Sequence, residues 1–103
     1  MENFCPDKVL RISILRSNKV LANGAEVELD ELKARLARLA SQKGAIWIYQ
    51  EPRGPGEDAP PIMGEVYKLI CHSDAEGIAG VDIAHTPDFS DLIASYGRAR
   101  PEE

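Results

Sequence analysis

Two cysteines and two histidines are the residues of this 103-residue chain best suited to nucleophilic or acid–base chemistry. A cysteine nucleophile needs a histidine base within hydrogen-bonding reach, and Cys71 and His72 are neighbours in the sequence. Both fall in an expected helix, where successive side chains point about 100° apart, so they do not face each other. A small enzyme that uses Cys71, His72 or His85 is an alternative, but we expect no catalytic residue and no enzymatic activity.

Metal and cofactor motifs do not occur in the sequence. Cys71, His72 and His85 match no recognised zinc spacing, and the two cysteines form no CxxC pair. The glycines at 54–56 and 77–80 form neither a dinucleotide-binding nor a phosphate-binding motif. The carboxylates are numerous but not paired, which is typical of a solvated acidic rim. We therefore expect no metal site and no cofactor.

The composition indicates one globular domain. Apolar residues make up 44% of the chain and charged residues 28%, and the net charge of −5 argues against nucleic acid as the main partner. The charge is uneven: residues 1–50 hold 8 basic and 6 acidic residues, and residues 51–103 hold 4 and 11, which gives +2 and −7. Either the uneven charge is a random distribution of charged residues on a solvated surface, or it gives the molecule a polarised surface that orients a partner.

The ends of the chain bear on its location and domain bounds. The N-terminus has neither the basic start nor the apolar segment of a signal peptide, and no apolar run is long enough to span a membrane. We expect a cytoplasmic protein as written, without membrane insertion by this chain, or a periplasmic domain if the chain is an excised piece. Residues 1–7 and 97–103 are expected to be tails around a single α+β domain at 8–96.

Periodicity predicts the order β-β-α-β-α-β-α. Leu29, Leu32, Leu36 and Leu39 form the clearest helical stripe, while residues 51–61 hold four of the seven prolines and are expected to form a loop. The expected strands are 9–15, 20–27, 45–50 and 78–84, and the second of them contains a turn at Asn23-Gly24. The expected helices are 28–43, 60–73 and 86–96. The last helix is expected to be capped by Thr86, with Pro87 in its first turn.

This order predicts an α+β two-layer sandwich with a mixed sheet and helices mainly on one face. The other face would then be open to solvent. Strand alternation places five side chains there, which we take as the partner-binding candidates: Arg11, Ser13, Trp47, Tyr49 and Asp82. The alternative is that the two aromatic residues pack under the proline-rich loop or the last helix.

In combination, these features resemble the soluble periplasmic domain of the ExbD/TolR family. The resemblance covers roughly residues 9–84. It depends on the strand 10–15, the Asn23-Gly24 turn, the 27–32 entry to the leucine-striped helix, the strand 46–49, the helix 63–70 and the segment 77–83. The chain has no counterpart of the family's transmembrane helix, so no residue here corresponds to the proton-carrying aspartate. Its proline-rich loop is longer than expected, and its last helix lies outside the match.

The resemblance implies a non-enzymatic, often dimeric domain that serves transport-related machines driven by the proton gradient and contacts partner proteins or peptidoglycan. We therefore expect a non-catalytic protein-binding module that acts through its open sheet face or an edge strand, with a protein partner or a second copy in a homodimer. The alternative is a small acidic cytoplasmic adaptor, or an immunity-type inhibitor of another protein.

Overall fold

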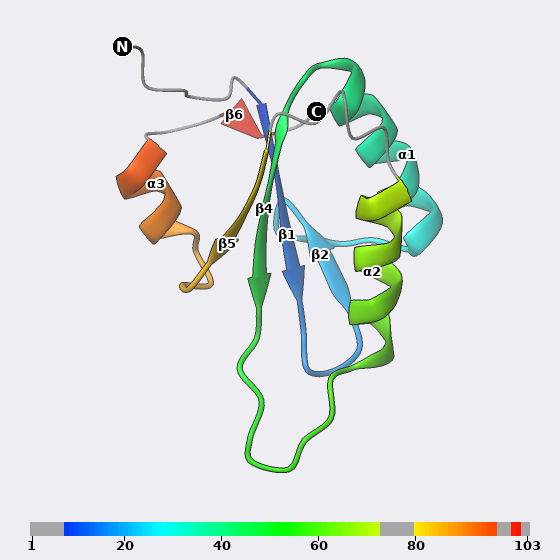
Figure 1. Ribbon diagram of the computed structural model, residues 1–103, viewed down its shortest axis with the longest axis vertical. Helices are drawn as coiled ribbons and strands as arrows, with labels where there is room; N and C mark the ends of the chain where they lie inside the picture. Colours follow the sequence, from blue (N-terminus) through cyan, green and yellow to red (C-terminus); the bar gives the residue numbers. More distant parts are fainter. Residues whose placement is uncertain (1–7, 73–79, 97–99, 102–103) are drawn as a thin grey trace.

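The computed structural model describes residues 8–72, 80–96 and 100–101. It confirms an α+β fold (Figure 1). The elements are β1 (Lys8–Ile14), β2 (Val20–Ala22), β3 (Ala25–Glu26), α1 (Leu29–Ser41), β4 (Ala45–Gln50), α2 (Pro61–His72), β5 (Gly80–Ala84), α3 (Ser90–Tyr96) and β6 (Arg100–Pro101).

The strands form one mixed sheet in the order β3-β2-β1-β4-β5, and β6 pairs with the first residues of β1. The β1–β4 and β4–β5 pairs are parallel, as expected for strands joined through helices, whereas β1 and β2 are antiparallel neighbours in a hairpin. The register places Ile12, Ile48 and Ile83 side by side across the sheet. The sheet is thus mixed, as the sequence predicted.

The larger core lies between the sheet and helices α1 and α2, which both cover the same face (Figure 1). Alternate residues of β1 and β4 enter it, and the leucine stripe of α1 packs against them. Its buried members are Leu10, Ile12, Ile14, Val20, Ala22, Leu32, Leu36, Leu39, Ile46, Ile48 and Val66.

Helix α3 lies on the opposite face of the sheet (Figure 1). It covers a smaller core of Val9, Ala45, Trp47, Ala84, Phe89 and Leu92. Because strand residues alternate between faces, apolar residues between those of the larger core need their own cover, and α3 supplies it. The two-layer description therefore holds for α1 and α2, and α3 adds a partial third layer.

Several boundaries differ from the sequence prediction. α3 begins at Ser90 rather than after Thr86, because Phe89 adopts a positive φ of 60° that interrupts the helix. Arg100–Pro101, in the predicted C-terminal tail, form β6 beside β1. The first residues of the predicted strand 78–84 lie outside the described residues.

Candidate functional site

Strand register brings the five predicted partner-binding residues into two neighbouring rows. Arg11, Trp47 and Asp82 lie side by side across β1, β4 and β5, and Ser13 lies beside Tyr49 in the next row. Alternation places both rows on the α3 side, where Trp47 packs with α3 and Tyr49 packs against the same cluster. The sequence therefore grouped these residues on one face correctly.

Trp47 is nevertheless not exposed, and this expectation was wrong. Its side chain is 0% exposed, and its ring stacks on Phe89 with 6.4 Å between the centroids. Ser13 is also buried, at 8% exposed, whereas Arg11, Tyr49 and Asp82 are half-buried. The alternative that an aromatic residue packs under the last helix applies to Trp47, which cannot contact a partner directly while α3 is in place.

Arg11 lies against both aromatic rings. Its Cζ is 5.5 Å from the centroid of Trp47 and 5.9 Å from that of Phe89, which is cation–π range. Its Nε is buried, and no group in the described part of the chain accepts its hydrogen. The guanidinium is thus held by packing on the two rings, and its Nε has no acceptor among the described residues.

A cleft of about 440 Å³ lies beside this arginine, between β1, β2 and the turn that leads into α3. We call it the Arg11 cleft. Its lining mixes polar with apolar side chains: Arg11, Ser13, Leu21, Asn23, Gly24, Pro87, Asp88 and Phe89. A volume of this size is within the range of small-ligand sites.

Asn23 fixes the backbone of β1 at the cleft. Its Oδ1 accepts the Arg11 backbone N–H at 3.0 Å, and its own N–H donates to the Arg11 carbonyl at 2.8 Å. Asn23 has a φ of 51°, and Gly24 has a φ of 90°, so the turn uses residue types that tolerate the left-handed region. The hairpin turn therefore also holds Arg11 in register.

The turn before α3 and the first turn of the helix each carry a carboxylate, Asp88 and Asp91, whose charged form is stabilised by hydrogen bonds. Hydrogen bonds from Ser90, including its backbone N–H at 3.1 Å, lower the pKa of Asp88 below its ordinary value. The His85 backbone N–H donates to Asp91 at 2.7 Å and is the main cause of a lowered pKa there. At neutral pH both are ionised, so Asp88 places a negative charge on the rim of the Arg11 cleft.

A second surface is formed by β5, which we call the β5 edge. In the described part of the chain, β4 is the one strand that pairs with β5, so the outward backbone groups of Gly80–Ala84 face no other strand. Val81 and Ile83 are 46% and 45% exposed and are the exposed large hydrophobic side chains of the described residues. They share rows with the buried Ile46 and Ile48, which places them on the α1–α2 side.

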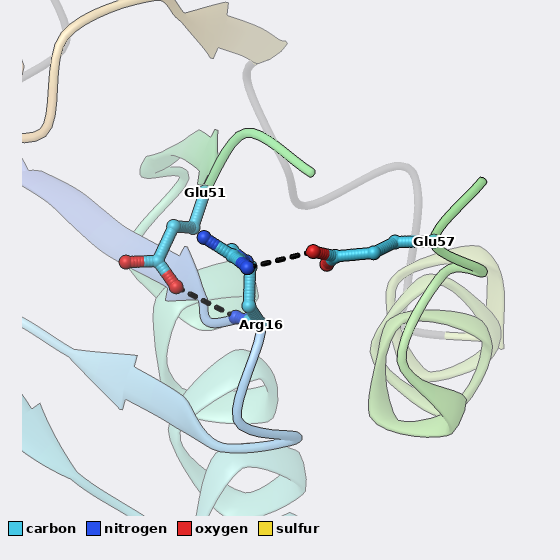
Figure 2. Close-up of polar contacts among 3 residues, drawn as sticks. All are labelled: Arg16, Glu51 and Glu57. Atoms are coloured by element: carbon cyan, nitrogen blue, oxygen red, sulfur yellow. Dashed lines mark hydrogen bonds and ion pairs between the residues drawn. The ribbon is translucent and has the colours of Figure 1, made fainter. Parts of the chain in front are cut away.

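The proline-rich loop after β4 is tied to the turn that follows β1. Figure 2 shows the Glu51 carboxylate accepting the Arg16 backbone N–H at 2.8 Å, and the Arg16 guanidinium pairing with Glu57 at 2.7 Å. Asn18 in the same turn accepts the backbone N–H of Ile62 at 2.8 Å and so caps α2. The ion pair is exposed, so it positions the loop more than it stabilises the fold.

The cysteine and histidine residues that could take part in catalysis or metal binding lie on separate elements. Cys71 is exposed in the last turn of α2, His85 is exposed after β5, and the side chain of His72 lies outside the described residues. No group of three or more His, Cys, Asp or Glu residues within the described ranges could hold a metal ion. A smaller cavity of about 240 Å³ by β3 and α1 has Glu26, Glu28 and Asp30 in its lining and shows no catalytic pairing.

Sequence reasoning missed three parts of these surfaces. Phe89 falls within the predicted helix 86–96, but in the structure it belongs to the turn before α3 and covers Trp47. Asn23 was recognised as a turn residue, but not as the acceptor for Arg11. The exposure of Val81 and Ile83 follows from the edge position of β5, which depends on strand order and has no signal in the local sequence.

No family model, curated protein or solved structure matches this chain significantly. The ExbD/TolR resemblance therefore stays a prediction. Within the described residues, no helix has both the length and the apolar character needed to cross a membrane.

Proposed function

We propose that this protein is a non-catalytic binding module that adds an extended segment of a protein partner to its sheet at the β5 edge. The observation that carries the proposal is that β5 is an edge strand and that two of its own apolar side chains, Val81 and Ile83, are exposed. Backbone groups of an edge strand can hydrogen-bond a partner's strand, and alternate side chains then set specificity. This edge is favoured over the sheet face because α3 already covers Trp47.

The two edges of the sheet differ in a way that supports this choice. The opposite edge, β3, has two residues, Ala25 and Glu26, and thus offers a short ladder with a charged side chain. β5 has five residues and presents two β-branched side chains on one face. Proteins usually cover or blunt apolar edge strands, so the exposure of Val81 and Ile83 on β5 supports a contact surface there.

The alternation of side chains along β5 also indicates what kind of partner segment would fit beside it. A strand added beside β5 would place every second side chain next to Val81 and Ile83, on the α1–α2 side. Burying these side chains favours apolar or β-branched residues at those positions of the partner. The intervening positions would lie on the side of Asp82 and α3, where polar residues fit.

The test compares capture of partners from the source cells by the wild-type chain, by Ile83→Lys and by Ala37→Lys. Ala37 is exposed on α1, so its variant matches the added charge away from the edge. We expect one partner to be retained by wild type and Ala37→Lys and lost, about tenfold or more, with Ile83→Lys, since a lysine at an edge opposes strand addition. Amide hydrogen exchange of that complex should then show protection at 80–84.

Equal retention of that partner by Ile83→Lys, or protection confined to another element, would contradict the proposal. Light scattering of the purified chain covers the case of a second copy as the partner. A dimer that Ile83→Lys dissociates and Ala37→Lys leaves intact would assign the same edge to self-association.

The ExbD/TolR resemblance supplies one class of partner for this edge, the components of membrane energy-transducing machines. An acidic cytoplasmic adaptor, or an inhibitor of another protein, would use the edge in the same way. The uneven charge, −7 for residues 51–103 from 4 basic and 11 acidic residues, favours a partner with a basic surface in either case. The identity of the captured partner separates the two.

A further inference from the structure

We propose that the Arg11 cleft is a binding site for the carboxylate of an organic acid that carries an apolar body. This site lies on the α3 side of the sheet, away from Val81 and Ile83, and is independent of strand addition at the β5 edge.

Placing the charged side chain of Arg11 in a partly buried position costs free energy of hydration. Its guanidinium lies over two aromatic rings and its Nε is buried, so part of its hydration is lost. No carboxylate in the described part of the chain is within ion-pair distance of it. An uncharged side chain of similar length would pack on the rings without this cost, which indicates that the positive charge has a use.

The cleft is where a counter-anion could approach this charge. The hydroxyl of Ser13 lines the same cleft and can donate a hydrogen bond next to the guanidinium. Asn23 holds the Arg11 backbone through two hydrogen bonds, and the two rings hold its side chain. The arginine is thus preorganised, so an anion would not have to order a flexible side chain.

The remainder of the lining selects the kind of anion. Leu21, Pro87 and Phe89 provide apolar contacts for the body of a ligand. Asp88 on the rim is ionised and repels a dianion more strongly than a monoanion, and the apolar part of the lining has no matching surface on inorganic phosphate. A guanidinium also matches the geometry of a carboxylate. These features together favour a monocarboxylate on an apolar carbon skeleton.

The chain contains its own reporter for this test. Trp47 is the single tryptophan and lies in contact range of both Arg11 and Phe89, so its fluorescence should respond to a ligand in the cleft. The probes are 3-phenylpropionate, N-acetylphenylalanine, the amides of both, and inorganic phosphate. We expect saturable binding of the two acids, and binding of the amides and phosphate that is weaker by about tenfold or more.

Four variants make the result specific. Arg11→Gln should abolish acid binding, while Arg16→Gln, which removes a different and exposed guanidinium, should leave it unchanged. Asp88→Asn removes the rim charge without touching the core, and should tighten acid binding by about twofold or more. Ile83→Lys should bind the acids normally, which separates a failure here from a failure at the β5 edge.

The comparison of the two acids assigns the natural source. Tighter binding of N-acetylphenylalanine indicates a peptide carboxyl terminus, and tighter binding of 3-phenylpropionate indicates a small acid. The proposal is overturned if acids and amides bind equally, if phosphate binds more tightly than the acids, or if no saturable change occurs. If Arg11→Gln does not fold, unchanged or weaker binding by Asp88→Asn overturns it as well.

Discussion

At the scale of the residue, Asp91 links pH to the stability of the turn before α3. Its carboxylate accepts the His85 backbone N–H at 2.7 Å and the Thr86 hydroxyl at 3.1 Å, and the lowered pKa means that the folded chain prefers the charged form. This contribution is complete above the unfolded pKa, near 3.8, and is lost as the pH falls through the lower folded value.

We therefore predict that Asp91→Asn destabilises the protein at pH 7 and reduces the loss of stability between pH 4 and pH 2. Urea unfolding midpoints at several pH values measure both effects, with Asp58→Asn, on the exposed loop, as the control. A pH profile of Asp91→Asn parallel to that of the wild type would show that the hydrogen bonds to Asp91 do not favour its charged form.

At the scale of the element, the two layers of helix cover unequal cores. Among the residues that the structure describes, the core on the α1–α2 side has eleven buried members and the core on the α3 side has six, so α1 packs against more apolar surface. Leu36 is 1% exposed and Leu92 is 8% exposed.

We predict that Leu36→Ala costs about 3–4 kcal/mol of the free energy of unfolding and Leu92→Ala about 2 kcal/mol, since residual cavity size sets the cost. Denaturant titration of both variants checks this. An equal or larger loss for Leu92→Ala would mean that α3 contributes more to the fold than its burial indicates.

At the scale of the whole molecule, a single sheet joins the two cores. β4 contributes Ile46 and Ile48 to one core and Ala45 and Trp47 to the other, so neither layer has a strand set of its own. Small domains with shared elements usually unfold in one step.

We predict that Trp47 fluorescence, which reports the α3 side, and far-UV circular dichroism, which reports mainly the longer α1 and α2, give coincident thermal transitions. If the fluorescence change precedes the loss of helix signal, α3 separates from the sheet before the rest unfolds. The Arg11 cleft would then open without global unfolding.

The sequence was most informative where the signal is local. Periodicity placed α1, α2 and β4 within a few residues, because each has a single apolar stripe or a compact β-branched run. The face of α3 could not be predicted, because its apolar residues fit either side of the sheet. The same alternation that grouped Arg11 and Trp47 could not show that Phe89 covers them, since that contact depends on the backbone of one turn residue.

The pairing of β6 with β1 has a consequence for synthesis on the ribosome. β1 emerges early, yet it receives β4 only after α1 has been made, and Lys8 and Val9 receive their partners Arg100 and Pro101 last of all. The apolar side chains of β1 obtain their full cover only after α1, β4 and α2 have been made, and the pairing with β6 completes the strand last. Chaperone binding to nascent chains that end before α2, and its loss in chains that include α2, would follow from this order.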